Sequence, residues 1–180
     1  MRLRATQIAC LSLALLLSAD AGAQESQPSE YQVKAAFLFN FAKFVEWPPG
    51  SFAGATSPMV IGILGDNPFG SDLEQTIQNK TINNRSIVIK PLPSLAEATN
   101  CQVLFISTSE KARLAEILVG LRGASVLTVS ETDGFTDAGG MINFVWEGKK
   151  IRFQINDEAA KKAKLKINSK LLGLAFHPAH

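Results

Sequence analysis

Histidine is scarce in this sequence, and its scarcity excludes several classes of enzyme. The 180 residues contain two histidines, His177 and His180, and both stand at the very end of the chain. Chain termini are commonly poorly ordered, so a catalytic triad or a histidine zinc site would be badly supported there. No group of residues forms a pattern typical of an active site. We therefore predict a protein that is not an enzyme and that holds no cofactor and no metal.

Cysteine is equally rare. Cys10 lies in an apolar run near the N-terminus, and Cys101 is the other cysteine of the sequence. If the N-terminal run is removed, an internal disulfide lacks a second cysteine, so the fold must be stabilised by its core. Cys101 directly precedes an apolar stretch, which favours a packed thiol. A reactive or intermolecular thiol is the alternative.

Long apolar runs are missing apart from the one at the N-terminus. There, a short basic region is followed by an apolar run over residues 8–17 and by the small residues Ala21, Gly22 and Ala23. The run is too short to cross a bilayer, and the pattern is typical of a secretory signal peptide. We predict a signal peptide over residues 1–23, cleavage before Gln24 and a single domain over residues 24–180. The mature chain should have no transmembrane segment.

The sequence also lacks a large excess of charge. It has 18 basic and 16 acidic residues, a formal net charge of +2, and this balance predicts no nucleic-acid partner. Lysines gather near the C-terminus between Lys161 and Lys170. We interpret them as a solvated face, with a weak attraction to an anionic membrane or an acidic partner as the alternative.

Apolar strands and helices alternate along the chain. Short apolar runs over residues 59–64, 87–89, 103–106 and 126–129 predict strands that are buried on both faces. Helices with caps at Asn67 and Ser107 should follow the first and third of these strands, and Pro91 and Pro93 should end the second. Such alternation favours parallel pairing with right-handed crossovers.

The pattern changes near the C-terminus. Ile142, Phe144 and Trp146 alternate with other residues, and the same alternation returns over residues 151–155. This pattern predicts an antiparallel hairpin, and short helices should follow it. The predicted fold class is α/β: a mostly parallel sheet with Rossmann-like strand–helix alternation, a C-terminal antiparallel hairpin and C-terminal helices.

The first predicted helix, over residues 31–46, is more apolar than one sheet face requires. Phe39 projects into its narrow polar stripe, beside Asn40 and Lys43. A helix that covers a sheet needs an apolar arc of only about 100°. We therefore predict that Phe39, Asn40 and Lys43 contact a partner or a second copy of the chain. A singly exposed aromatic side chain is the alternative for Phe39.

Polar residues follow three of the predicted parallel strands, where ligands bind in open α/β sheets. A ligand crevice would be lined by Asp66, Asn67, Ser107, Thr108, Ser130 and Glu131. This crevice supports a small-molecule-binding module, and an enzyme would have to rely on carboxylates such as Asp66 and Glu131. We interpret residues 65–70 and 133–140 as a capped turn and a glycine-rich loop rather than as nucleotide or calcium sites.

Several longer segments carry a resemblance to a known family. They are residues 31–48, 61–70, 101–107, 139–144 and 153–156, which together extend over nearly all of the predicted mature chain. Through them the sequence resembles the YfiR-like family of bacterial periplasmic regulators. The resemblance implies a non-catalytic periplasmic protein that binds and represses the sensory region of an inner-membrane diguanylate cyclase, lowering cyclic di-GMP signalling and biofilm formation.

The resemblance implies further partners as well. They are an outer-membrane lipoprotein and a second copy of the chain in a homodimer. Members with redox control carry cysteine pairs, so an internal disulfide switch is not expected with Cys101 alone. Other relatives accompany histidine kinases or outer-membrane receptors, and a small-molecule-binding module associated with such a sensor is therefore the alternative function.

Overall fold

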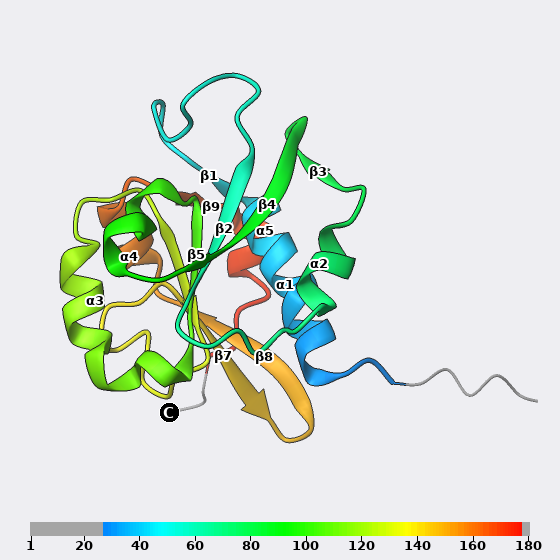
Figure 1. Cartoon of the computed structure of the whole chain (residues 1–180). Coiled ribbons are helices and arrows are strands. Elements are labelled where there is room, and N and C mark those ends of the chain that lie inside the picture. The colour runs from blue at the N-terminus through cyan, green and yellow to red at the C-terminus, as the bar shows by residue number, and fades with distance from the viewer. Residues whose placement is uncertain (1–26, 178–180) are drawn as a thin grey trace, which may run out of the picture.

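A computed structural model describes residues 27–177, so the predicted signal peptide and its cleavage site lie outside the described residues. The main sheet has the strand order β3-β4-β2-β5-β6-β7-β8 (Figure 1). Its parallel strands are β2 (Met59–Leu64), β4 (Arg85–Leu92), β5 (Val103–Ile106), β6 (Leu127–Ser130) and β7 (Ile142–Glu147). The edge strands β3 (Thr81–Ile82) and β8 (Lys150–Ile155) are antiparallel to their neighbours. The predicted fold class is confirmed.

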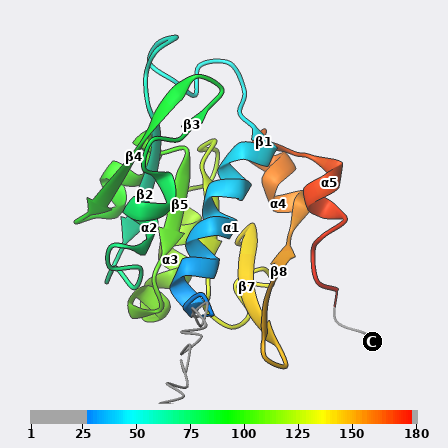
Figure 2. The same cartoon turned by 90° about the vertical axis from the view of Figure 1, so that its right-hand side faces the viewer.

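Helices cover both faces of this sheet (Figures 1 and 2). One face carries α1 (Glu30–Phe44) and α2 (Asp72–Ile77), and the other carries α3 (Leu114–Gly120). Two 3₁₀ segments, η1 (Leu95–Asn100) and η2 (Thr108–Arg113), precede α3. After β8 come α4 (Asp157–Lys162) and α5 (Ser169–Leu172), beside a separate antiparallel pair of β1 (Val45–Glu46) and β9 (Lys166–Ile167).

The predicted first helix is present, and local chemistry explains both of its ends. The Ser29 side chain accepts from the Gln32 backbone N–H while the Gln32 side chain accepts from that of Ser29, which is a capping box. The helix ends at Phe44, ahead of Trp47 and Pro48, because Val45 is extended and pairs with Ile167. Phe41 is fully buried on the sheet side, as its position in the apolar arc indicates.

The strand β5 shows why the sequence runs are apolar without alternation. Its residues are all buried, because Val103 and Phe105 belong to the core under α1 while Leu104 and Ile106 belong to the core under α3. A strand between two helical layers has no solvent-facing side. The apolar runs at residues 59–64 and 103–106 therefore correspond to β2 and β5 without adjustment.

Two local predictions were wrong. Helix α2 begins at Asp72, not after Asn67, because the Asn67 carboxamide accepts from the Phe69 backbone N–H at 3.0 Å and forms a turn. Pro91 does not end its strand but lies inside β4, opposite Ile63. β3 pairs only with Arg85 and Ser86, so the outer edge of β4 at Pro91 has no strand neighbour among the described residues. Proline is tolerated at such an edge.

The predicted hairpin is confirmed, but its tip extends beyond the core. Ile142 and Phe144 are buried, whereas Trp146 is 55% exposed. Figure 1 shows β7 and β8 projecting past the other strands. The alternation continues to Trp146, but no helix covers that side chain.

Candidate functional site

The edge at which the parallel strands end was predicted to hold a ligand crevice, and its middle is closed by loop contacts. Gly65 has φ +87°, and a Cβ at this position would lie 2.4 Å from the Ser109 hydroxyl oxygen. The Asp66 backbone N–H donates to the same oxygen at 2.9 Å. The loops after β2 and β5 therefore touch at the point where the strand order reverses. Asp66 and Asn67 are exposed beside this contact.

The buried hydroxyls of this edge are occupied by internal hydrogen bonds. The Ser130 hydroxyl donates to the Ile106 carbonyl at 2.8 Å and accepts from the Thr132 backbone N–H at 3.1 Å. The Ser107 hydroxyl accepts from the Ser109 backbone N–H at 3.4 Å. These serines hold the strand ends and loops in place, and a ligand would have to displace their bonds.

A buried lysine joins the first helix to the end of β6. The Lys34 ammonium donates to the carboxylates of Glu131 and Glu30, and the Tyr31 hydroxyl donates to Glu131 at 3.3 Å. The side chains of Lys34 and Glu131 are only 4% and 10% exposed. Sequence reasoning missed this pair, although a lysine inside an apolar arc is a signal that a buried partner exists.

Burial and hydrogen bonding act in opposite directions on Lys34. Burial lowers the pKa of its ammonium, but the hydrogen bonds to Glu131 and Glu30 raise the pKa by more, so it ends above its ordinary value. Burial and the negative charge of Glu131 also raise the pKa of Tyr31. At neutral pH, Lys34 is therefore charged and Tyr31 keeps its proton, which is the state that forms the network.

Two of the predicted crevice residues do share a cavity. Thr108 and Glu131 line a space of about 540 Å³ together with Tyr31, Asp133 and Trp146. Asp66, Asn67, Ser107 and Ser130 do not line it. The edge therefore has a hollow at its β6–β7 end that holds two of the six predicted residues, and ligand binding there stays a prediction.

The predicted contact residues lie on α1, the helix in front of the sheet in Figure 2, and Phe39 packs partly against the core. Phe39 and Asn40 are half-buried, and Lys43 is exposed. The Lys80 ammonium lies 5.0 Å from the centre of the Phe39 ring, so a lysine from the neighbouring loop covers part of this aromatic side chain. Whether these three residues bind a partner stays a prediction.

A second exposed surface lies beside the N-terminal end of α1. Trp146, Val33, Phe37 and Ile151 line a groove of about 360 Å³. Basic side chains stand along the same groove, namely Lys149, Lys150 and Arg152. The alternation of apolar residues in the hairpin could not indicate this surface, because it does not show which of those residues extend beyond the core.

The Cys101 thiol is buried, and burial raises its pKa, as expected for a packed thiol. Within residues 27–177 no cluster of three or more histidine, cysteine or acidic side chains could hold a metal ion. In the same range, no helix has the length and apolar character needed to cross a membrane.

The comparison with protein families decides the assignment. A family model described as YfiR/HmsC-like matches residues 31–176, from α1 to the segment after α5. The chain belongs to this family. Membership in this family agrees with the expectation of a periplasmic regulatory protein.

Two solved structures share the fold at low sequence identity. One is a conserved domain protein from Vibrio cholerae, with a TM-score of 0.55 and 12% identity over 83% of this chain and 60% of that chain. The other is the ABC domain from Streptococcus pneumoniae in complex with L-Trp, with a TM-score of 0.52 and 11% identity over 78% and 60%. The chain thus spans about 60% of the length of each structure. A comparison with curated proteins finds no significant match.

Proposed function

We propose that this protein binds and represses the sensory region of an inner-membrane diguanylate cyclase from the periplasm. The YfiR/HmsC-like match over residues 31–176 carries the proposal. Binding stabilises the inhibited conformation of the sensor, and the output follows from the difference in affinity for its two states. A difference of about 1.4 kcal/mol shifts that equilibrium tenfold.

The groove beside the hairpin supports this role because it offers an exposed aromatic side chain at a mixed surface. Trp146 is 55% exposed, and tryptophan is enriched among the residues that dominate binding energy. The basic side chains of Lys149 and Lys150 fit an acidic segment of the sensory region, whereas Arg152 already pairs with Glu147 at 2.8 Å. Phe39, Asn40 and Lys43 on α1 form a second proposed contact, with the cyclase or with a second copy of the chain. An outer-membrane lipoprotein would relieve repression by competing for one of these surfaces.

The proposal is tested by deleting the gene and measuring cyclic di-GMP. Its concentration should rise, with more biofilm and less motility, because the cyclase loses its repressor. A gene that encodes Trp146→Ala should fail to restore the low level, whereas Leu174→Ala should restore it. Leu174 is a matched control because it is 67% exposed and lies outside the groove. Unchanged cyclic di-GMP across several growth conditions would contradict the proposal.

Purified proteins allow the contact on α1 to be tested separately. Truncation of an interface hot spot costs about 2 kcal/mol or more, so Phe39→Ala should weaken association about thirtyfold. Affinity for the isolated sensory region and the equilibrium of self-association should both be measured. If Phe39→Ala changes neither of them, α1 contributes no contact surface.

A second candidate function is a small-molecule-binding module associated with a sensor kinase or an outer-membrane receptor. The cavity that brings Thr108 and Glu131 together at the strand ends favours it. Native mass spectrometry of protein purified from the periplasm discriminates between the two functions. A retained metabolite that is lost in a Thr108→Ala variant would support the module, and co-purification of the cyclase would support the repressor.

A further inference from the structure

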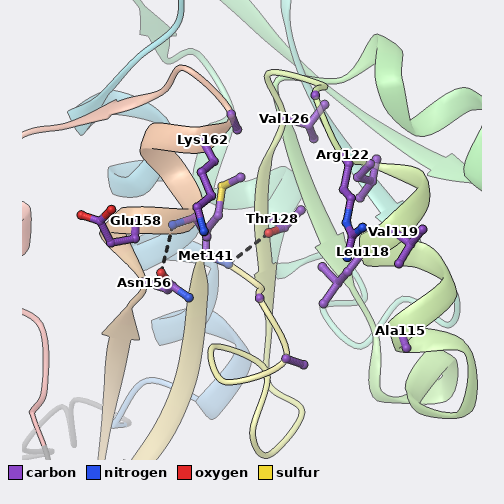
Figure 3. Close-up of a pocket in the computed structure, with 16 residues that line it drawn as sticks. Ala115, Leu118, Val119, Arg122, Val126, Thr128, Met141, Asn156, Glu158 and Lys162 are labelled. Atoms are coloured by element: carbon purple, nitrogen blue, oxygen red, sulfur yellow. Dashed lines mark hydrogen bonds between the residues drawn. The ribbon is translucent and has the colours of Figure 1, made fainter.

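A cleft between α3 and α4 lies away from both surfaces described above. Its volume is about 610 Å³, within the range of small-molecule sites. Ala115, Leu118 and Val119 of α3 form one wall, and Glu158, Ala159 and Lys162 of α4 form the facing wall (Figure 3). Val126 and Met141, which directly precede β6 and β7, form its base.

Apolar side chains supply most of the contact surface. Leu118, Val126 and Met141 come from three different parts of the chain and converge on the cleft. Val126 and Met141 are buried, so the base of the cleft is set by the core and is already formed without a ligand. A preformed apolar base favours a ligand with an aliphatic or aromatic body.

The polar groups at the base are already satisfied. The Thr128 hydroxyl accepts from the Met141 backbone N–H at 3.1 Å. The Asn156 carboxamide accepts from the Ala159 backbone N–H and donates to the Thr136 carbonyl, both at 2.9 Å. These groups therefore add little to recognition, and selectivity depends on the charged side chains.

Two cations stand on opposite sides of the cleft. Figure 3 shows Arg122 next to α3 and Lys162 on α4, with Thr128 between them and Met141 beside Lys162. Within residues 27–177 neither cation forms an ion pair with a carboxylate. Glu158 also lines the cleft, but its carboxylate pairs with Lys161 at 3.0 Å. The arrangement leaves a positive charge at each side of an apolar base.

We propose that this cleft binds a small organic anion, namely a carboxylate attached to an aliphatic or aromatic body. The body packs on Leu118, Val126 and Met141, and the carboxylate is attracted by the positive charges of Arg122 and Lys162 on the two sides of the cleft. The site is distinct from the strand-end cavity, which is lined by Glu30, Glu131 and Asp133. Binding is a property of the purified chain and does not depend on the cyclase as partner.

The test uses purified mature protein and three probes: 2-naphthoate, the neutral naphthalene-2-methanol, and acetate. Amide signals should be followed by NMR during each titration. 2-Naphthoate should shift the signals of Leu118, Arg122, Met141 and Lys162 and bind about tenfold more tightly than the alcohol. The factor follows from two exposed charge–charge attractions, each contributing about threefold. Acetate should cause no saturable shift, because it lacks the apolar body.

Neighbouring lysines provide the matched control. Arg122→Gln and Lys162→Gln should each weaken 2-naphthoate binding about threefold. Lys161→Gln should not, because Lys161 is paired with Asp157 and Glu158 and does not line the cleft. Ala115→Trp, at an exposed position in the α3 wall, should block binding by filling the cleft.

Three results would overturn the proposal. The alcohol could bind as tightly as 2-naphthoate, or Lys161→Gln could weaken binding as much as Lys162→Gln, which would indicate diffuse attraction to the lysine-rich segment. The shifted signals could also map to Thr108 and Glu131 at the strand-end cavity. The affected side chains are exposed, so the variants should fold, and a wild-type pattern of unaffected NMR signals verifies this.

Discussion

The ion pair between Lys34 and Glu131 allows a quantitative prediction about stability. Both side chains are almost fully buried, so removing one partner leaves the other charge only partly compensated in the interior. Breaking a buried pair typically costs about 3–5 kcal/mol. Lys34→Met should cost about 3 kcal/mol, the lower value, because Tyr31 still donates to Glu131. Glu131→Gln should cost less, about 2 kcal/mol, because Lys34 keeps Glu30 as a partner.

The double variant separates pairing from simple loss of contacts. If the two charges compensate each other, Lys34→Met with Glu131→Gln should cost about 3 kcal/mol rather than the additive value of about 5. Urea unfolding of the four proteins gives these differences, provided that the m-value is unchanged. For a chain of this length, about 3 kcal/mol lowers the melting temperature by about 6–12 °C.

An additive result would refute the reasoning. It would mean that the pair does not couple α1 to the end of β6 and that each side chain acts through its own packing. A double variant that is more stable than wild type would instead be consistent with coupling, because apolar replacement of buried pairs is sometimes stabilising.

Three further predictions concern the core, alkaline pH and processing. Phe41→Ala should lower the free energy of unfolding by about 4 kcal/mol, measured by calorimetry. The Phe41 ring is fully buried, and its centre lies 4.9 Å from the centre of the Phe153 ring and 5.6 Å from that of Phe144. Half-buried Phe39→Ala should cost clearly less, and equal losses would contradict this difference. The pKa of Lys34 is raised on folding, so the charged ammonium stabilises the protein fully below the unfolded pKa of 10.5, and this stabilisation is lost as pH rises through the folded pKa. In urea unfolding, wild type should therefore lose stability at alkaline pH, and Lys34→Met should lack this part of the loss. N-terminal sequencing of periplasmic protein should begin at Gln24, and an intact Met1 would show that residues 1–23 are not cleaved.

The strands and the first helix could be predicted because their signals are local. Apolar runs such as residues 103–106 form strands that are buried on both faces, so every residue in the run must be apolar. The ends of helices were less predictable where a side chain can form a local turn instead of capping the helix. The Asn67 side chain forms a local turn, and Gly70 has a φ of +53°, which is not a right-handed helical conformation. The helix α2 therefore begins only at Asp72.

The candidate site was predicted less well because it depends on tertiary contacts. Lys34 and Glu131 are separated by 97 positions, and neither residue alone indicates its partner. The strand order does bring the ends of β2, β5 and β6 together, as expected. The sequence cannot show, however, that the Gly65 and Ser109 loops touch or that α1 reaches the end of β6.

These contacts together explain where binding surfaces remain on this fold. In open α/β sheets, ligands usually bind at the carboxyl ends of the strands where the strand order reverses. Here the Gly65 loop contacts the Ser109 loop at that point. The ion pair of Lys34 with Glu131 also holds α1 against the end of β6. The surfaces that remain are the hollow at the β6–β7 end of this edge, the exposed Trp146 on the hairpin and the cleft between Arg122 and Lys162. The exposed Trp146 on the projecting hairpin is therefore the side chain whose substitution most directly tests the proposed partner binding.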